Sequence, residues 1–226
     1  MNAQTSVVRQ MVWKDIQMHR KLMASLMIFG AAGLGLFLVK REPYTVLGGI
    51  ALFTALILTS AFVPGSNILN ERKRQTLPFL MSLPISAIQY TTAKLLSTVG
   101  MFLIPWTTLV IAAIWMIAVE GVLPHGAIPM ALMLLTLPFV NVCGITAMNL
   151  VGETEGWNGA AQVIFNSVPG VIWYLITLSP ALTRDLGSSQ AVWNPTVLTF
   201  LGSEFAVIVL ILALTYYLQS RKRDFV

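Results

Sequence analysis

The chain has 226 residues, of which 56% are hydrophobic and only 10% charged, and its mean hydropathy is +0.77. A soluble domain carries about a quarter charged residues, so this composition excludes an ordinary water-soluble domain and indicates an integral membrane protein. The one cysteine, Cys143, excludes an internal disulfide and a cysteine-cluster metal site. The net charge of +5 is explained better by membrane topology than by nucleic-acid binding, because the basic residues collect beside apolar segments.

Six apolar segments are long enough to cross about 30 Å of hydrocarbon as helices. Helices are expected because lipid cannot satisfy free backbone groups, and the sequence has no barrel-like alternation. The prediction is therefore an all-α integral membrane protein with one domain over 1–226. The predicted spans are 22–39, 46–63, 95–119, 127–150, 163–182 and 196–218.

The basic residues predict the orientation. Eleven of the fourteen lysines and arginines lie before the first span, between the second and third spans, or after the sixth. The positive-inside rule then places both termini in the cytoplasm.

Residues 1–21 are predicted to form an interfacial helix on the inner leaflet. The segment 7–21 contains no helix breaker, and Val8, Val12 and Ile16 form an apolar stripe at four-residue spacing. The alternative is a solvated basic leader that only fixes the topology.

The sequence lacks the common motifs for nucleotide binding, metal-dependent hydrolysis and nucleophilic catalysis. It has no G-x-x-x-x-G-K-[ST] phosphate-binding loop, no H-E-x-x-H, and no Ser/His/Asp set with plausible spacing. We therefore expect a protein that is not itself an enzyme and that holds no cofactor. If it does work, the energy comes from an ion gradient or from a partner.

Three residues inside the predicted spans are candidates for the substrate pathway. Glu204 is the clearest candidate for a substrate or proton site, because an intramembrane charge is costly. The alternative is a glutamate that faces polar atoms in the bundle or lies nearer the outer interface. Asn141 and Asn166 are candidates for the substrate pathway, although hydrogen bonds between helices would also explain them.

Backbone irregularities also have two interpretations. Pro64-Gly65, Pro138 and Pro169-Gly170 are expected to kink or break their helices, as hinges or as static packing features. The small-residue pair Ala31-x-x-x-Gly35 permits close helix approach, either within one subunit or between two copies.

The segment 70–86, "NERKRQTLPFLMSLPIS", begins charged and becomes apolar. Thr76 is a plausible N-cap, and Pro84 disfavours helix at the preceding residue, so a short helix is predicted over 77–83. Such a helix has almost no polar face and must bury itself in lipid, in the bundle or in a groove of another protein. Ser86-x-x-Gln89 then reads as a capping box that starts a helix over 87–119, which is longer than the membrane is thick.

This segment resembles the loop between the second and third spans of ABC-2 type transporter permeases. The family has an acidic-basic start, a Thr-Leu step, an "LLSLP"-like run and a lysine that opens the next helix. The matching residues here are Glu71, Arg72, Thr76, Leu77, Leu80, Ser82, Leu83, Pro84 and Lys94. Six spans, internal termini and an N-terminal interfacial helix also fit the family.

The resemblance implies a permease subunit that forms a homodimer or heterodimer and binds two copies of an ABC ATPase, which would hold ATP and Mg. The 70–86 segment would be the cytoplasmic coupling helix, seated in the ATPase. The implied contact residues are Glu71, Arg72, Thr76, Leu77, Phe79, Leu80 and Leu83. The loop 152–160 would be a second contact through Glu153 and Glu155, unless it is only a solvated turn.

An exporter in a prokaryotic-type cytoplasmic membrane is the leading hypothesis. The predicted external loops, 40–45, 120–126 and 183–195, leave no domain to receive substrate from a soluble binding protein. An amphiphilic or hydrophobic substrate is therefore expected. The alternatives are an ATP-independent carrier that uses Glu204 and a non-transporting membrane scaffold or sensor.

Overall fold

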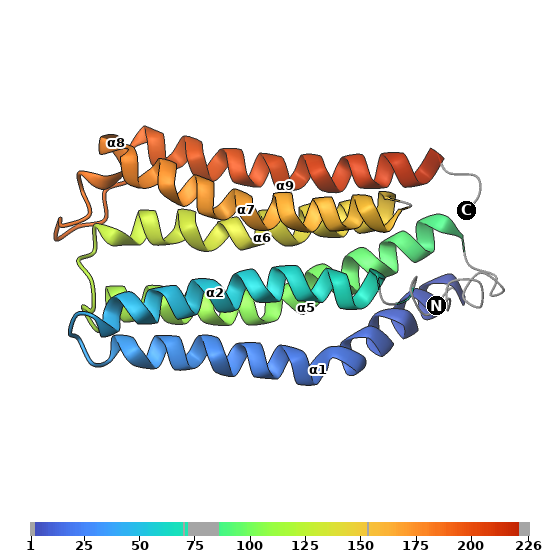
Figure 1. The fold of residues 1–226 in the computed structure, drawn as a ribbon, viewed down its shortest axis with the longest axis horizontal. Helices are drawn as coiled ribbons and strands as arrows, with labels where there is room; N and C mark the ends of the chain where they lie inside the picture. The colour runs from blue at the N-terminus through green and yellow to red at the C-terminus, as the bar shows by residue number, and fades with distance from the viewer. Residues whose placement is uncertain (1–2, 70, 72–85, 153, 222–226) are drawn as a thin grey trace.

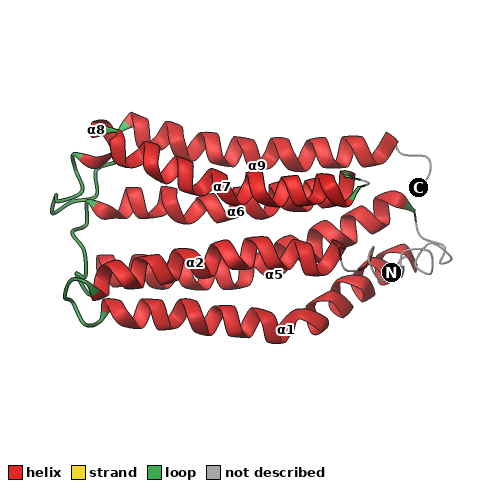
Figure 2. Ribbon diagram, in the orientation of Figure 1, coloured by secondary structure: helices red, strands yellow, loops and turns green. Residues whose placement is uncertain are grey.

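The computed structural model describes residues 3–69, 71, 86–152 and 154–221, and within these ranges every regular element is a helix. The long helices lie side by side along one axis as an elongated bundle (Figures 1 and 2). The start of the first helix and the end of the last lie at the same end of the bundle, which we call the terminal end.

Among the described residues six helices are long and apolar enough to cross a membrane, which agrees with the six spans predicted from sequence. Two short elements accompany them, the π-helix η1 (Gly65–Leu69) directly after α2 and the single-turn helix α8 (Pro180–Thr183). The six long helices are α1 (Ala3–Phe37), α2 (Tyr44–Pro64), α5 (Ala87–Ala118), α6 (Ala127–Val151), α7 (Glu155–Leu178) and α9 (Pro195–Arg221).

Helix α1 differs from the prediction because it has no break near residue 21. It runs through the predicted interfacial segment and the first predicted span as one helix, and it bends partway along (Figure 1). No proline or glycine precedes Gly30 in this helix, so nothing in the local sequence ends it earlier. A surface position for its first turns remains a prediction.

The buried face of α1 also differs from the predicted one. Met11, Asp15, His19 and Met23 are buried at four-residue spacing, whereas the predicted stripe of Val8, Val12 and Ile16 is only half-buried. A carboxylate and an imidazole therefore lie in the middle of the face that packs against the bundle.

Other helix ends follow local signals. Ser86 and Gln89 form the predicted capping box, with N···O distances of 2.9 and 3.3 Å, and α5 begins at the next residue. Helix α7 begins earlier than predicted, because Thr154 caps it at the amide of Trp157. The predicted loop 152–160 is therefore mostly helix.

The prolines have different effects in different helices. Helix α2 ends at Pro64 and gives way to η1, as the sequence predicted. Pro138 and Pro169 lie inside α6 and α7, which continue through them. Helix α7 ends at Leu178, short of the predicted boundary at 182, and Pro180 opens α8.

Helices α1 and α2 approach closely at a pair of glycines. A methyl group added to Gly48 would lie 2.7 Å from the carbonyl oxygen of Gly33, so only glycine fits there. The predicted small-residue pair does not make this contact, because Ala31 and Gly35 are exposed.

Helix α6 is the central helix, in contact with α2, α5, α7 and α9. In its most apolar stretch 61% of the residues are buried, against 17% for α7 and for α9. The outer faces of α7 and α9 are apolar and exposed, which suits contact with lipid.

Candidate functional site

Four charged side chains form a closed ring near the terminal end. Lys14 pairs with Glu71 at 2.9 Å, Glu71 with Lys94 at 2.8 Å, Lys94 with Asp15 at 2.9 Å, and Asp15 with Lys14 at 3.3 Å. We call these residues the four-charge ring. Positive and negative charges alternate around it, so its formal charge is zero.

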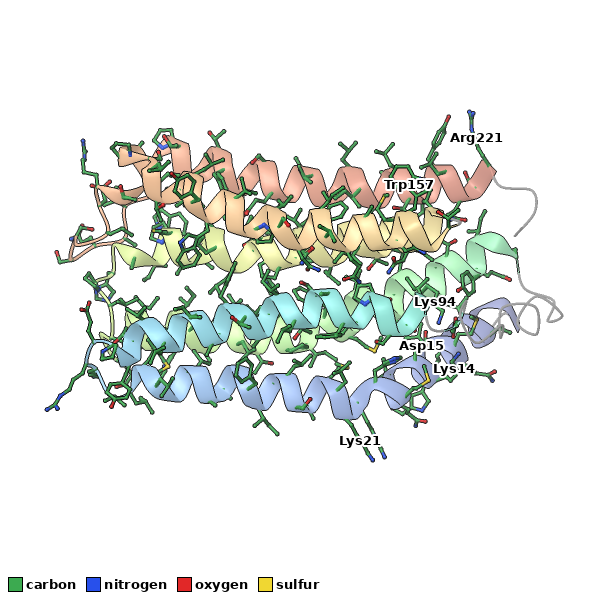
Figure 3. All side chains as sticks on the ribbon, in the orientation of Figure 1. Lys14, Asp15, Lys21, Lys94, Trp157 and Arg221 are labelled. Atoms are coloured by element: carbon green, nitrogen blue, oxygen red, sulfur yellow. The ribbon has the colours of Figure 1, made fainter. Side chains whose placement is uncertain are left out.

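The ring joins three parts of the chain. Lys14 and Asp15 belong to α1, Lys94 lies two turns into α5, and Glu71 follows η1 at the end of the second span. Figure 3 shows Lys14, Asp15 and Lys94 together where the lower part of the bundle narrows toward the terminal end. One cluster of charges thus ties α1 and α5 to the residues that lead into 72–85.

Burial makes the ring energetically important. The side chains of Lys94 and Asp15 are fully buried and that of Glu71 is nearly so, while Lys14 is half-exposed. A buried charge without a partner is strongly destabilising, whereas a complete set of pairs offsets most of the desolvation penalty. The ring is therefore stable only when its members are held together.

Hydrogen bonds from η1 and α5 hold the ring in place. The Lys94 ammonium donates to the backbone oxygen of Asn67 at 3.2 Å and to its side-chain oxygen at 3.1 Å. The Asn67 amide donates in turn to Ser97 and Thr98 at 2.9 and 2.8 Å, and Ser97 donates to Asp15 at 3.0 Å. The wider π-helical turn at 65–69 thus places an asparagine between the lysine and the next turn of α5.

A second polar network crosses the middle of the bundle. The Gln162 amide donates to the carbonyl of Ala61 at 3.3 Å, and Asn166 donates to the Gln162 oxygen at 3.3 Å. Asn141 then donates to Asn166 at 3.0 Å and to Ser60 at 2.8 Å. The direction of these bonds is fixed, because backbone carbonyls at the Gln162 and Ser60 ends can only accept.

Beside this network lies a cavity of about 310 Å³ between α6, α7 and α9. Glu204 reaches it from α9, is 5% exposed, and neither of its carboxylate oxygens has a hydrogen-bond partner. The walls are otherwise mostly apolar. The lining residues are Leu137, Val140, Asn141, Phe165, Val168, Pro169, Ile172, Phe200, Ser203, Glu204 and Val207.

The residues proposed from sequence fall into four groups. Glu71 is in the four-charge ring, and the substrate-pathway candidates Asn141, Asn166 and Glu204 lie in or beside the cavity. Glu155 is the first residue of α7. The remaining coupling residues lie outside the described residues: Arg72, Thr76, Leu77, Phe79, Leu80, Leu83 and Glu153.

Sequence reasoning missed most of the ring. Lys94 was noted only as part of a family pattern, while Lys14, Asp15 and Asn67 were not proposed as site residues. The available signal was Asp15 itself, which lies four residues after Met11 and eight before Met23, on the same helical face as these apolar residues.

No group of three or more histidine, cysteine or acidic side chains that could hold a metal ion occurs within the described ranges.

Comparison of the chain with protein-family models, with curated proteins and with solved structures finds no match in any of the three. The functional argument below therefore rests on the geometry of the chain and on the pattern of its sequence.

Proposed function

We propose that the chain is the transmembrane permease subunit of an ATP-binding-cassette exporter, of the ABC-2 type that its 70–86 segment resembles. It would move an amphiphilic or hydrophobic substrate across the membrane, or out of it, by alternating access. ATP hydrolysis would occur in a separate subunit, because the sequence has no phosphate-binding loop. The six candidate spans support a multi-pass membrane protein.

The four-charge ring is the observation that carries the proposal. Glu71 lies at the start of the 70–86 segment proposed to meet the ATPase, and it pairs with Lys94 of α5 at 2.8 Å and with Lys14 of α1 at 2.9 Å. Separating such buried pairs costs several kcal/mol. A displacement at Glu71 is therefore expected to carry α1 and α5 with it rather than to break the ring.

The orientation follows from the basic residues. Eleven of the fourteen lysines and arginines lie within residues 9–21 of α1, between the end of α2 and Lys94 of α5, or from the last residue of α9 onward. The start of α1, the start of α5 and the end of α9 lie at the terminal end, and by the positive-inside rule we propose that this end faces the cytoplasm. An ATPase in the cytoplasm would then meet the same end of the bundle that holds the ring.

The proposal implies a set of partners. Two permease chains, identical or different, would associate in a prokaryotic-type cytoplasmic membrane and bind two ATPase copies that hold ATP and Mg. Lipid would cover the exposed apolar faces of α7 and α9. Nucleic acid has no part in this function.

A second candidate is an ATP-independent carrier. It is favoured by one observation, the unpartnered carboxylate of Glu204 in an intramembrane cavity, since ionisable groups in spans often mark ion-coupled transport. In that case transport would be abolished by Glu204→Gln and would not depend on ATP.

The test is co-purification in mild detergent. We expect the wild-type chain to retain an ABC ATPase, and Phe79→Asp with Leu80→Asp to release it, because two carboxylates cannot be buried in an apolar groove. A matched control is Val192→Asp with Trp193→Asp, which alters two exposed apolar residues in the connection between α8 and α9. If the ATPase stays bound to the Phe79/Leu80 variant and hydrolyses ATP normally, the docking assignment is wrong. Binding of a partner without any flux in proteoliposomes would instead indicate a scaffold.

A further inference from the structure

The cavity between α6, α7 and α9 has an unusual balance of polar atoms. Its buried hydrogen-bond acceptors include both carboxylate oxygens of Glu204 and the side-chain oxygen of Asn141, and none of these three atoms has a hydrogen-bond partner. Three acceptors without donors at one mostly apolar site are costly, since an unsatisfied buried polar atom costs about 1–3 kcal/mol.

The donors around this cavity are already engaged. Both amide hydrogens of Asn141 are engaged within the protein, one with Ser60 at 2.8 Å and the other with Asn166 at 3.0 Å. The hydroxyl of Ser203 donates to the backbone oxygen of Phe200 at 2.7 Å. The polar lining side chains Asn141, Ser203 and Glu204 therefore present acceptors to a ligand.

A cationic head group satisfies such a site. An ammonium brings positive charge and up to three donors, which match the carboxylate of Glu204 and the free oxygen of Asn141. The rings of Phe165 and Phe200 also line the cavity and can face a cation. A phosphate or sulfate group finds no free donor among these side chains.

The apolar part of the cavity selects the rest of the ligand. Leucine, valine, isoleucine and phenylalanine side chains form most of its wall. Its volume of about 310 Å³ is at the small end of the range for small-molecule sites, about 300–1,000 Å³. Glu204 lies nine residues from the start of α9, about 13 Å along the helix, so a ligand there lies within the depth of the spans.

We propose that this cavity binds the head of a single-chain cationic amphiphile, with Glu204 as the residue that accepts its ammonium group. This inference rests on the proposed function, because it names the substrate class of the permease. It requires neither ATP nor an ATPase partner for binding, so it can be tested on the purified chain alone.

The experiment is photolabelling in phosphatidylcholine nanodiscs with a dodecylamine that carries a diazirine in its tail. The matched probes are the alcohol and the sulfate with the same tail, and the labelled peptides are identified by mass spectrometry. We expect the amine to label α6, α7 and α9 lining peptides at least about tenfold more strongly than the alcohol or the sulfate, as for a hydrogen bond to a charged group.

Substitutions at Glu204 test whether this residue is responsible for the preference for the amine probe. Glu204→Gln, which keeps the side-chain shape, should reduce amine labelling about tenfold or more, and Glu204→Asp should retain part of it. Glu120→Gln is the control, because that carboxylate lies in an outer connection and pairs with Lys40 at 3.7 Å. Equal labelling by amine and alcohol, or full labelling of Glu204→Gln, would overturn the proposal.

A lipid source of the same chemistry is tested by adding phosphatidylethanolamine to the nanodiscs. Its ammonium lies next to a phosphate, so we expect no competition with the amine probe. Competition by this lipid would contradict the exclusion of phosphate-bearing head groups. Because these measurements contain no ATPase, a failed co-purification and a failed binding test remain distinct results.

Discussion

Removing one charge from the four-charge ring should unfold the protein at a much lower temperature. Asp15→Asn keeps the shape of the side chain but leaves two lysines against the single carboxylate of Glu71. Lys94 is fully buried and loses the partner that lies 2.9 Å away. Removing one partner of a buried pair costs about 3–5 kcal/mol, and for a chain of this size each kcal/mol lowers the melting temperature by about 2–4 °C. The expected decrease is roughly 6–20 °C.

The assay uses the only cysteine in the chain. Cys143 is fully buried in α6, so a thiol-reactive fluorescent dye reacts with it only when the bundle opens. A matched control is Glu120→Gln, which removes a carboxylate from a half-exposed pair with Lys40. Such a pair contributes about 0–1 kcal/mol, so the melting temperature of this variant should barely change.

The double variant Asp15→Leu with Lys94→Met separates the contribution of the ring to stability from its role in linking the movements of α1 and α5. Replacing a buried ion pair by apolar side chains is often neutral or stabilising, so most of the loss should be recovered while Lys14 and Glu71 keep their own pair. The reasoning is refuted if Asp15→Asn melts within about 1 °C of the wild type, because the ring would then contribute little to the fold.

Two further predictions concern helix packing. Gly48→Ala should lower the free energy of unfolding by about 1–3 kcal/mol, because its new methyl group meets the backbone of Gly33. Gly35→Ala is the control and should leave stability unchanged, because the space around Gly35 is open. The dye assay compares the melting temperatures of the two variants. Trp106→Phe should cost about 1 kcal/mol, since the indole N–H donates to the carbonyl of Leu135 at 2.6 Å between α5 and α6, and an unchanged melting temperature would show that this bond contributes nothing net.

The elements that sequence predicted best depend on local signals. Continuous apolar length gave the six spans, and the Ser86–Gln89 capping box set the start of α5 at the correct residue. Thr154 is an equally local cap for α7, but the predicted span began with the apolar run at residue 163, which is later than the start of the helix. The sequence was divided at residue 21 into an interfacial helix and a span, whereas α1 is one helix over Ala3–Phe37, because no proline or glycine before Gly30 interrupts it.

The site was less accessible from sequence because its contacts are distant along the chain. Asp15 and Lys94 are separated by 79 residues, and Lys14 and Glu71 by 57. No local pattern predicts that these side chains meet. The position of Asp15 on the same helical face as Met11 and Met23 does indicate that this carboxylate is buried. Burial of Glu204 was a reasonable expectation, whereas its lack of partners depends on how side chains from three helices surround the cavity.

The central claim is that the four-charge ring makes α1 and α5 one mechanical unit that follows the ATPase. Pulsed electron paramagnetic resonance can test it with spin labels on exposed positions: Met18 in α1, Ile88 in α5 and Tyr217 in α9, each changed to cysteine in pairs. Cys143 is buried and can stay in place.

The measurement is made on the complex with the co-purified ATPase, before and after addition of ATP. The account predicts that the distance between labels at 18 and 88 stays constant while the distance between labels at 88 and 217 changes. In the Asp15→Leu, Lys94→Met variant the first distance should change as well. A wild-type complex in which the 18-to-88 distance changes as much as the 88-to-217 distance would contradict the account.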